Sequence, residues 1–162
     1  MNTQREQLIQ SWIASVLGSD QFETHFLAGD ASFRRYARIK LNNKTFMLMD
    51  APPEKEDCVP FVTIDEFFDA NGVRVPHIVA KDLEQGFLLL EDFGDVLLST
   101  QLDDKTVDAH YEQSFKQLIQ LQSIDGEGHF PAYSYEKLMT EMSLLTDWLL
   151  PSLQIQPSDD ES

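Results

Sequence analysis

The segment from Gly29 to Tyr36 carries the residue types that a phosphate-binding loop needs. It reads GDASFRRY, and its small residues would let backbone N–H groups approach phosphate oxygens. Five of the chain's 12 basic residues lie within eleven positions, at Arg34, Arg35, Arg38, Lys40 and Lys44. In a chain of net charge -16, this concentration favours an anionic ligand. The alternative is that these arginines lie on the outer face of a strand and pair with surface carboxylates.

The elements that would position this loop are strands with one inserted helix. Alternation of apolar residues predicts an antiparallel sheet with strands at 22–26, 33–41, 45–49, 73–83 and 87–91, of which the first three form a meander. A stripe of Phe61, Ile64 and Phe68 predicts a helix near 59–71 that packs on the sheet through these three side chains.

Helices are expected before the sheet and after it along the sequence. A first helix is predicted from Thr3 to Gly18. Two more are predicted after Gly94, one capped by Asp103 and one capped by Ser134 and stopped by Pro151. The order of strands and helices is shared by many α+β domains and does not by itself define a function.

Three segments at matching positions strengthen this order into a resemblance. They are the loop above, the stretch FMLMDAPPEKEDC from Phe46 to Cys58, and the stretch GFLLLEDFG from Gly86 to Gly94. Across roughly residues 22–94 the chain resembles the aminoglycoside phosphotransferase-like kinases, most of all the bacterial anomeric kinases of N-acetylmuramate and N-acetylglucosamine. The resemblance implies an α+β fold with a protein-kinase-like small lobe in residues 1–94. The first helices of an incomplete large lobe would follow in 95–151, and a disordered acidic tail in 152–162.

The resemblance also implies a site for ATP. The loop would cover the phosphates, while the Glu91 carbonyl and the Phe93 N–H would meet the adenine edge at the hinge between the lobes. Met49 stands where most kinases carry a third-strand lysine, so either the arginines replace that lysine or nucleotide binding is weak. A simple core position is an equal alternative for Met49. The nucleotide-binding residues so implied are Ala31, Ser32, Phe33, Arg34, Met49, Glu91 and Phe93.

Two kinase features are out of place in this sequence. The helix glutamate that pairs with the third-strand lysine falls near Val62, where Asp65 and Glu66 are only nearby substitutes. The letters Asp92-Phe93-Gly94 spell the metal-binding tripeptide, but they end the fifth strand, whereas the metal-binding aspartate belongs to the large lobe. We interpret the tripeptide as a coincidence.

The catalytic loop of such a kinase is not found. It needs an aspartate in a His-x-Asp sequence, a following asparagine and a second aspartate for Mg²⁺. No histidine has an aspartate two positions later, and the spacing of the four predicts no metal site: His25, His77, His110 and His129. We therefore expect no catalytic or metal-binding residue here, magnesium ligands outside this chain, and no kinase activity for this chain alone.

The function expected is thus ATP-dependent phosphorylation of a sugar hydroxyl by a longer protein, here represented by a fragment. The alternative is a non-catalytic nucleotide-binding or protein-interaction module. The acidic composition argues against nucleic acid, and no apolar run approaches the roughly 18 residues of a membrane span. A single cysteine, Cys58, fits a reducing cytoplasm. Expected partners are a nucleotide, a small sugar and a second copy bound through exposed C-terminal helices; the sequence leaves the acceptor sugar open.

Overall fold

The sheet that the sequence predicts is present, with one helix before it in the chain and one inserted between its strands. The computed structural model describes residues 3–29 and 32–155. Its first elements are α1 (Thr3–Leu17), β1 (Glu23–Phe26), β2 (Arg35–Leu41), β3 (Lys44–Asp50), α2 (Val59–Ala70), β4 (Ile78–Asp82) and β5 (Phe87–Glu91). The five strands form one sheet in the order β1-β2-β3-β5-β4, and every neighbouring pair is antiparallel. The predicted α+β small lobe is therefore confirmed.

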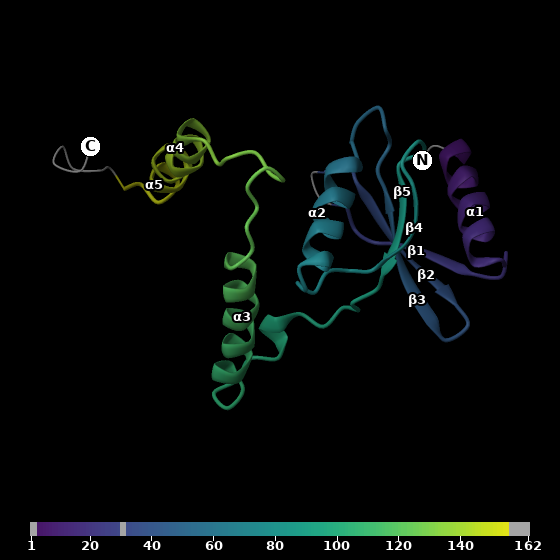
Figure 1. Cartoon of the computed structure of the whole chain (residues 1–162), viewed down its shortest axis with the longest axis horizontal. Helices are drawn as coiled ribbons and strands as arrows, with labels where there is room; N and C mark the ends of the chain where they lie inside the picture. The colour runs from purple at the N-terminus through teal and green to yellow at the C-terminus, as the bar shows by residue number, and fades with distance from the viewer. Residues whose placement is uncertain (1–2, 30–31, 156–162) are drawn as a thin grey trace. The chain divides into compact units, whose positions relative to one another are not determined.

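The two helices cover opposite faces of this sheet (Figure 1). Side chains alternate between the faces of a strand, so neighbouring residues of β2 and β3 join different cores. On the α1 side, Ile9 and Ile13 are fully buried among five sheet residues: Ala37, Ile39, Leu48, Phe87 and Leu89. On the α2 side, Val62 is buried with Met49, Leu88 and Leu90.

The expected packing of α2 was wrong in part. Val62 and Asp65 are its buried residues, and Phe61 packs partly buried against the same core. Ile64 remains 40% exposed and lines an open pocket together with Phe68. Apolar residues occupy nearly every side of this helix, so the periodicity could not fix which side faces the sheet.

The fourth strand is shorter than predicted, because β4 begins only at Ile78. Pro76 has no N–H to donate to a neighbouring strand, which accounts for the irregular segment before β4. His77 consequently lies outside the strand to which the sequence assigned it. The pairing of β4 with β5 also shifts register between Ile78 and Ala80.

The chain divides into two compact units, residues 1–122 and 123–162. After β5 the first unit contains a short 3-10 turn at Leu98–Thr100 and helix α3 (Val107–Gln122). The second unit contains α4 (Tyr135–Leu144), a π-helical segment (Leu145–Leu149) and α5 (Leu150–Ser152).

The predicted Ser134 cap is confirmed, since its side chain accepts a hydrogen bond from the Lys137 N–H at 3.2 Å. Pro151 does not stop the helical path, which is a correction to the sequence prediction. It lies in the first turn of α5, where its missing N–H is tolerated.

The C-terminal helices expose apolar side chains, as predicted. Tyr111 and Phe115 of α3 are 46% and 57% exposed, and Met142 and Trp148 are 60% and 74% exposed. No helix in the described ranges is long and apolar enough to cross a bilayer. The predicted tail lies mainly outside the described residues, since only 152–155 fall within them, and Ser152 belongs to α5.

Candidate functional site

A pocket of about 280 Å³ lies where the sheet passes into the linker after β5. We call it the hinge pocket; its lining residues are Tyr36, Met47, Phe61, Pro76, Leu90, Glu91, Asp92, Phe93 and Gly94. These residues come from three adjacent strands, from α2, from the segment before β4 and from the linker itself. The pocket therefore joins an apolar wall to a stretch of main chain.

Strand register explains the apolar wall. Met47 on β3 is paired with Leu90 on β5, and Tyr36 on β2 lies two residues from the partner of Met47 on that strand. Because side chains two residues apart share a face of a strand, all three point toward the α2 side of the sheet. Such a surface suits a flat, weakly polar ring such as a purine.

The linker brings Glu91 and Phe93 to the same pocket. The Glu91 N–H donates a hydrogen bond to the His77 carbonyl at 2.8 Å. This bond uses the N–H of Glu91 and does not use its carbonyl. Within the described residues, no acceptor is bonded to the Phe93 N–H. The Phe93 side chain is 59% exposed, and the Arg74 guanidinium lies 4.6 Å from its ring centre.

The side chain of Glu91 is engaged away from any ligand. Its carboxylate pairs with Arg74 and accepts the His77 N–H at 3.2 Å. The hydrogen bond from Arg74 holds the pKa of Glu91 below its usual value. With the N–H and the carboxylate of Glu91 both engaged, its carbonyl is the group that a ligand in the hinge pocket could use.

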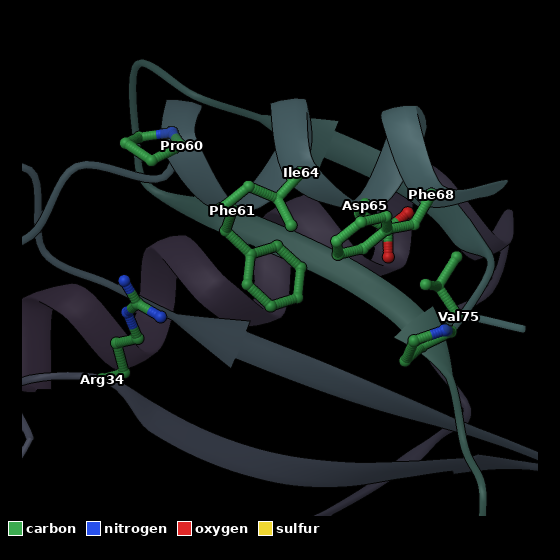
Figure 2. A pocket seen from close by; sticks show the side chains of 8 residues that line it. Arg34, Pro60, Phe61, Ile64, Asp65, Phe68 and Val75 are labelled. Carbon is green, nitrogen blue, oxygen red and sulfur yellow. The ribbon is translucent and has the colours of Figure 1, made fainter. Parts of the chain in front are cut away.

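A second pocket of about 330 Å³ adjoins the first and shares Phe61 and Pro76 with it. We call it the helix pocket; it is lined by Arg34, Pro60, Phe61, Ile64, Asp65, Phe68, Val75 and Pro76. Figure 2 shows Arg34 on one side of the Phe61 ring and Asp65 on the other, with Val75 farther from Arg34 than Asp65. The walls are mainly apolar, and the charged residues that line the pocket are Arg34 and Asp65.

Arg34 faces the helix pocket because of the alternation of β2. Arg35 is paired in register with Asp50, and its side chain binds that aspartate on the α1 face. Arg34, the preceding residue, is thereby turned to the opposite face, which Tyr36 and Met49 share. Among the described residues its guanidinium has one weak ion pair, with Nε 3.4 Å from Oε2 of Glu56, so with respect to these residues it keeps capacity to bind an anion.

Asp65 is a buried carboxylate that the sequence offered only as a substitute for the helix glutamate. It is 7% exposed, and no basic side chain in the described part of the chain forms an ion pair with it. Burial raises its pKa, and the nearby Asp69 and Glu66 raise it further. Asp65 lies four residues after Phe61 and three before Phe68, and this helical spacing could have revealed it.

The helix acid was expected near Val62, but Val62 belongs to the apolar core. Asp65, which the sequence offered only as a substitute, is the acid on this face of α2.

Met49 is not among the residues that line the hinge pocket, whereas Met47, two positions earlier on β3, is. Met49 is fully buried, and its sulfur accepts a hydrogen bond from the Tyr36 hydroxyl at 3.4 Å. Of the loop residues, Phe33 is 60% exposed beneath Lys55, and the Ser32 hydroxyl accepts the Arg34 N–H at 3.1 Å. Ala31 lies outside the described residues. The structure thus brings Arg34, Glu91 and Phe93 to the two pockets and places Met49 in the core.

Two other arginines pair with carboxylates, as the alternative to an anion site expected, but the side chains of their partners Asp50 and Asp92 are buried and are not surface groups. Arg35 binds Asp50, which is fully buried, and Arg38 binds Asp92 and Asp95. His25 lies on the exposed strand β1 and contacts Glu23 at 3.0 Å. Within residues 3–29 and 32–155, no three side chains suited to a metal ion lie together.

Comparison with known proteins agrees with this geometry. The sequence profile of the phosphotransferase enzyme family matches residues 23–161. The chain is 42% identical over 123 residues to an N-acetylmuramate/N-acetylglucosamine kinase of Pseudomonas aeruginosa, which covers 76% of this chain and 36% of that protein. A protein of the same name from Neisseria meningitidis is 31% identical over 152 residues, or 91% of this chain and 45% of that protein. A third, from Pseudomonas putida, is 37% identical over 121 residues, or 75% and 36%. The matched part of the chain thus spans 36% to 45% of these relatives' length.

Proposed function

Because this chain belongs to the phosphotransferase enzyme family, we propose that it forms the nucleotide-binding part of an ATP-dependent kinase that phosphorylates a hydroxyl group of an amino sugar. The observation that carries the proposal is the hinge pocket, which has an apolar wall and a main-chain edge and adjoins a second pocket containing Arg34. A purine in the first pocket would have its phosphates on the side of the Ser32 loop and Arg34.

The roles of the residues follow from their chemistry. The Glu91 carbonyl would accept from the adenine amino group, and the Phe93 N–H would donate to a ring nitrogen. Arg34 would bind phosphate oxygens through its planar guanidinium, which replaces the point charge of a lysine. Magnesium would neutralise the phosphates when it is bound. The described residues bring no set of magnesium ligands together, so no residue of this chain is assigned to hold it.

The sugar is proposed from the names of the relatives, which are N-acetylmuramate/N-acetylglucosamine kinases. The acceptor would then be an amino sugar of cell-wall recycling, and the reaction would take place in the cytoplasm. The chain alone should show no turnover, since the aspartate base that activates the sugar hydroxyl is not found in it. A second copy that covers the exposed helices α3 and α4 remains a prediction.

Nucleotide binding by the complete protein tests the proposal through three variants. Phe93→Pro removes the N–H donor and should weaken binding of both ATP and adenosine by roughly 1 to 3 kcal/mol. Arg34→Ala should weaken ATP by roughly 1.5 to 3 kcal/mol and adenosine much less, because it removes a phosphate partner only. Glu91→Ala is the matched control at the hinge and should change either affinity little. Calorimetric titration would measure all three.

Two results would contradict the proposal. If the unaltered protein binds neither ATP nor adenosine, the hinge pocket is no nucleotide site. If it binds ATP but transfers no phosphate to any amino sugar, the non-catalytic module is the better interpretation. A reading frame that continues past Ser162 with His-x-Asp and a following asparagine would favour the kinase over that module.

A further inference from the structure

Two aspartates of the linker, Asp92 and Asp95, bind the same guanidinium. Arg38 Nε lies 2.6 Å from Asp92 Oδ2, and Arg38 Nη2 lies 3.0 Å from Asp92 Oδ1. The same Nη2 lies 2.9 Å from Asp95 Oδ1, and Nη1 contacts Asp95 Oδ2. One arginine of β2 therefore holds the linker on both sides of Phe93 and Gly94.

The contact between Arg38 and Asp92 is sheltered from solvent. The Arg38 side chain is 14% exposed and that of Asp92 is 3% exposed. Arg38 is paired in register with Met47, which lines the hinge pocket. The guanidinium thus rises from the strand position beside this pocket and reaches its rim. Ion pairs in such partly desolvated positions fix geometry better than exposed ones.

The main chain between the two aspartates is shaped by the same group. Oδ1 of Asp92 accepts the Gly94 N–H at 2.9 Å and closes a tight turn around Phe93. Gly94 has φ +79, a conformation in which glycine is favoured. The hydrogen bonds from Arg38 hold the pKa of both Asp92 and Asp95 below the usual value, so both remain charged at neutral pH.

Without Arg38, the linker would carry a destabilising concentration of negative charge. Asp92 and Asp95 lie within four positions, and Asp92 has little solvent to stabilise its charge. Mutual repulsion would favour a linker that swings away from the sheet. The N–H of Phe93 would then have no fixed direction relative to the hinge pocket.

We propose that Arg38 is a positioning residue, which clamps Asp92 and Asp95 and thereby holds the Phe93 N–H at the rim of the hinge pocket for a ring nitrogen of a purine. The identity of the ligand rests on the proposed function; the ordering of the linker does not. The tripeptide Asp92-Phe93-Gly94 acquires a role that involves no metal, because its aspartate binds an arginine and its phenylalanine supplies a main-chain donor.

The test compares Arg38→Met with Arg5→Met in the complete protein. Arg5 is the matched control, since it also binds a buried aspartate, Asp50, but on the α1 face of the sheet. Amide hydrogen exchange would be followed at Phe93, Gly94 and Asp95, and affinity would be measured for adenosine and for ATP. Arg38→Met should accelerate exchange at these amides and weaken both ligands by the same factor, roughly fivefold for one main-chain hydrogen bond. Arg5→Met should leave exchange in the linker and both affinities unchanged.

The outcomes separate this proposal from the proposed function. Unchanged linker exchange in Arg38→Met overturns the clamp, whether or not nucleotide binds. Faster exchange with unchanged adenosine affinity overturns the positioning role and leaves the nucleotide site standing. If the unaltered protein binds neither adenosine nor ATP, the purine role is overturned together with the proposed function, and faster exchange would then support the ordering of the linker alone. Arg38→Lys should recover exchange protection only in part, because lysine lacks the fork that reaches both carboxylates.

Discussion

Replacement of Asp50 by asparagine should strongly destabilise the fold, because Asp50 is a fully buried carboxylate with two arginine partners. Arg5 Nε is 2.8 Å from Oδ1, and Arg35 Nε is 2.8 Å from Oδ2. Arg5 also donates to the Gln85 carbonyl at 2.8 Å and lies 4.7 Å from the Phe87 ring centre. Asparagine would leave two guanidinium groups facing a neutral amide, with the less exposed of them only 15% exposed.

The magnitude follows from this burial. Removing one partner of a buried ion pair typically costs about 3 to 5 kcal/mol, because the remaining charge is left without compensation. Arg5→Met should cost less, about 1.5 to 3 kcal/mol, since Asp50 keeps Arg35. Replacing all three by apolar residues, as in Arg5→Met with Arg35→Met and Asp50→Leu, should recover most of the loss, because no charge then remains buried.

Urea unfolding followed by tryptophan fluorescence would measure these costs. Trp12 is a suitable reporter, because its ring centre lies 5.5 Å from that of Phe87, which Arg5 covers. A cost below about 1 kcal/mol for Asp50→Asn would refute the reasoning, since it would mean that water compensates the cluster. So would a triple variant less stable than Asp50→Asn, because the loss would then come from packing instead of unpaired charge.

Three further predictions concern stability. Gly86→Ala should cost at least about 2 kcal/mol in urea unfolding, because φ is +72 and a Cβ would lie 1.9 Å from the Ala51 carbonyl oxygen; Gly18→Ala, with φ +65 and open space, is the control and should cost only about 1 kcal/mol. Asp65→Asn should raise the free energy of unfolding at neutral pH. Burial raises the pKa of Asp65 in the folded state, so its cost is present above that pKa and disappears as the pH falls toward the unfolded value; a gain that persists at low pH would contradict this. Arg74→Ala should change the unfolding free energy by less than about 1 kcal/mol, since its ion pair is solvent-exposed, and a larger loss would show that its contact with Phe93 matters.

The sheet was predictable because its strands show two patterns that are typical of strands, alternation in β2 and a short apolar run in β5. Ala37 and Ile39 alternate with polar residues, and the apolar β5 fits a strand between two neighbours. Helix α2 has apolar residues on nearly every side. The sequence therefore predicted Phe61, Ile64 and Phe68 as its buried side, whereas its buried residues are Val62 and Asp65. Helical periodicity identifies a helix well, but it fixes the buried face only where one side is polar.

The candidate site was predictable in its main-chain parts and less so in its side chains. The resemblance to the kinases implied Glu91 and Phe93 as hinge residues, and both line the hinge pocket where β5 ends. The roles of Asp65 and Arg38 depend on contacts between elements far apart in the chain. Arg38 and Asp95, for example, are 57 residues apart, and no local pattern joins them.

Two of the three arginines in the basic segment, Arg35 and Arg38, are committed to carboxylates within the fold. Arg35 is turned to the α1 face and neutralised by Asp50, and Arg38 is turned to the hinge and outnumbered by two carboxylates. Among the residues that line the two described pockets, Arg34 alone is cationic, and its contact with Glu56 is weak. One guanidinium cannot balance the charge of a triphosphate in a chain of net charge -16. If ATP is the ligand, most of the compensating charge must therefore come from bound magnesium and from groups other than the residues that line these pockets. Removal of magnesium should consequently weaken the binding of ATP far more than Arg34→Ala does.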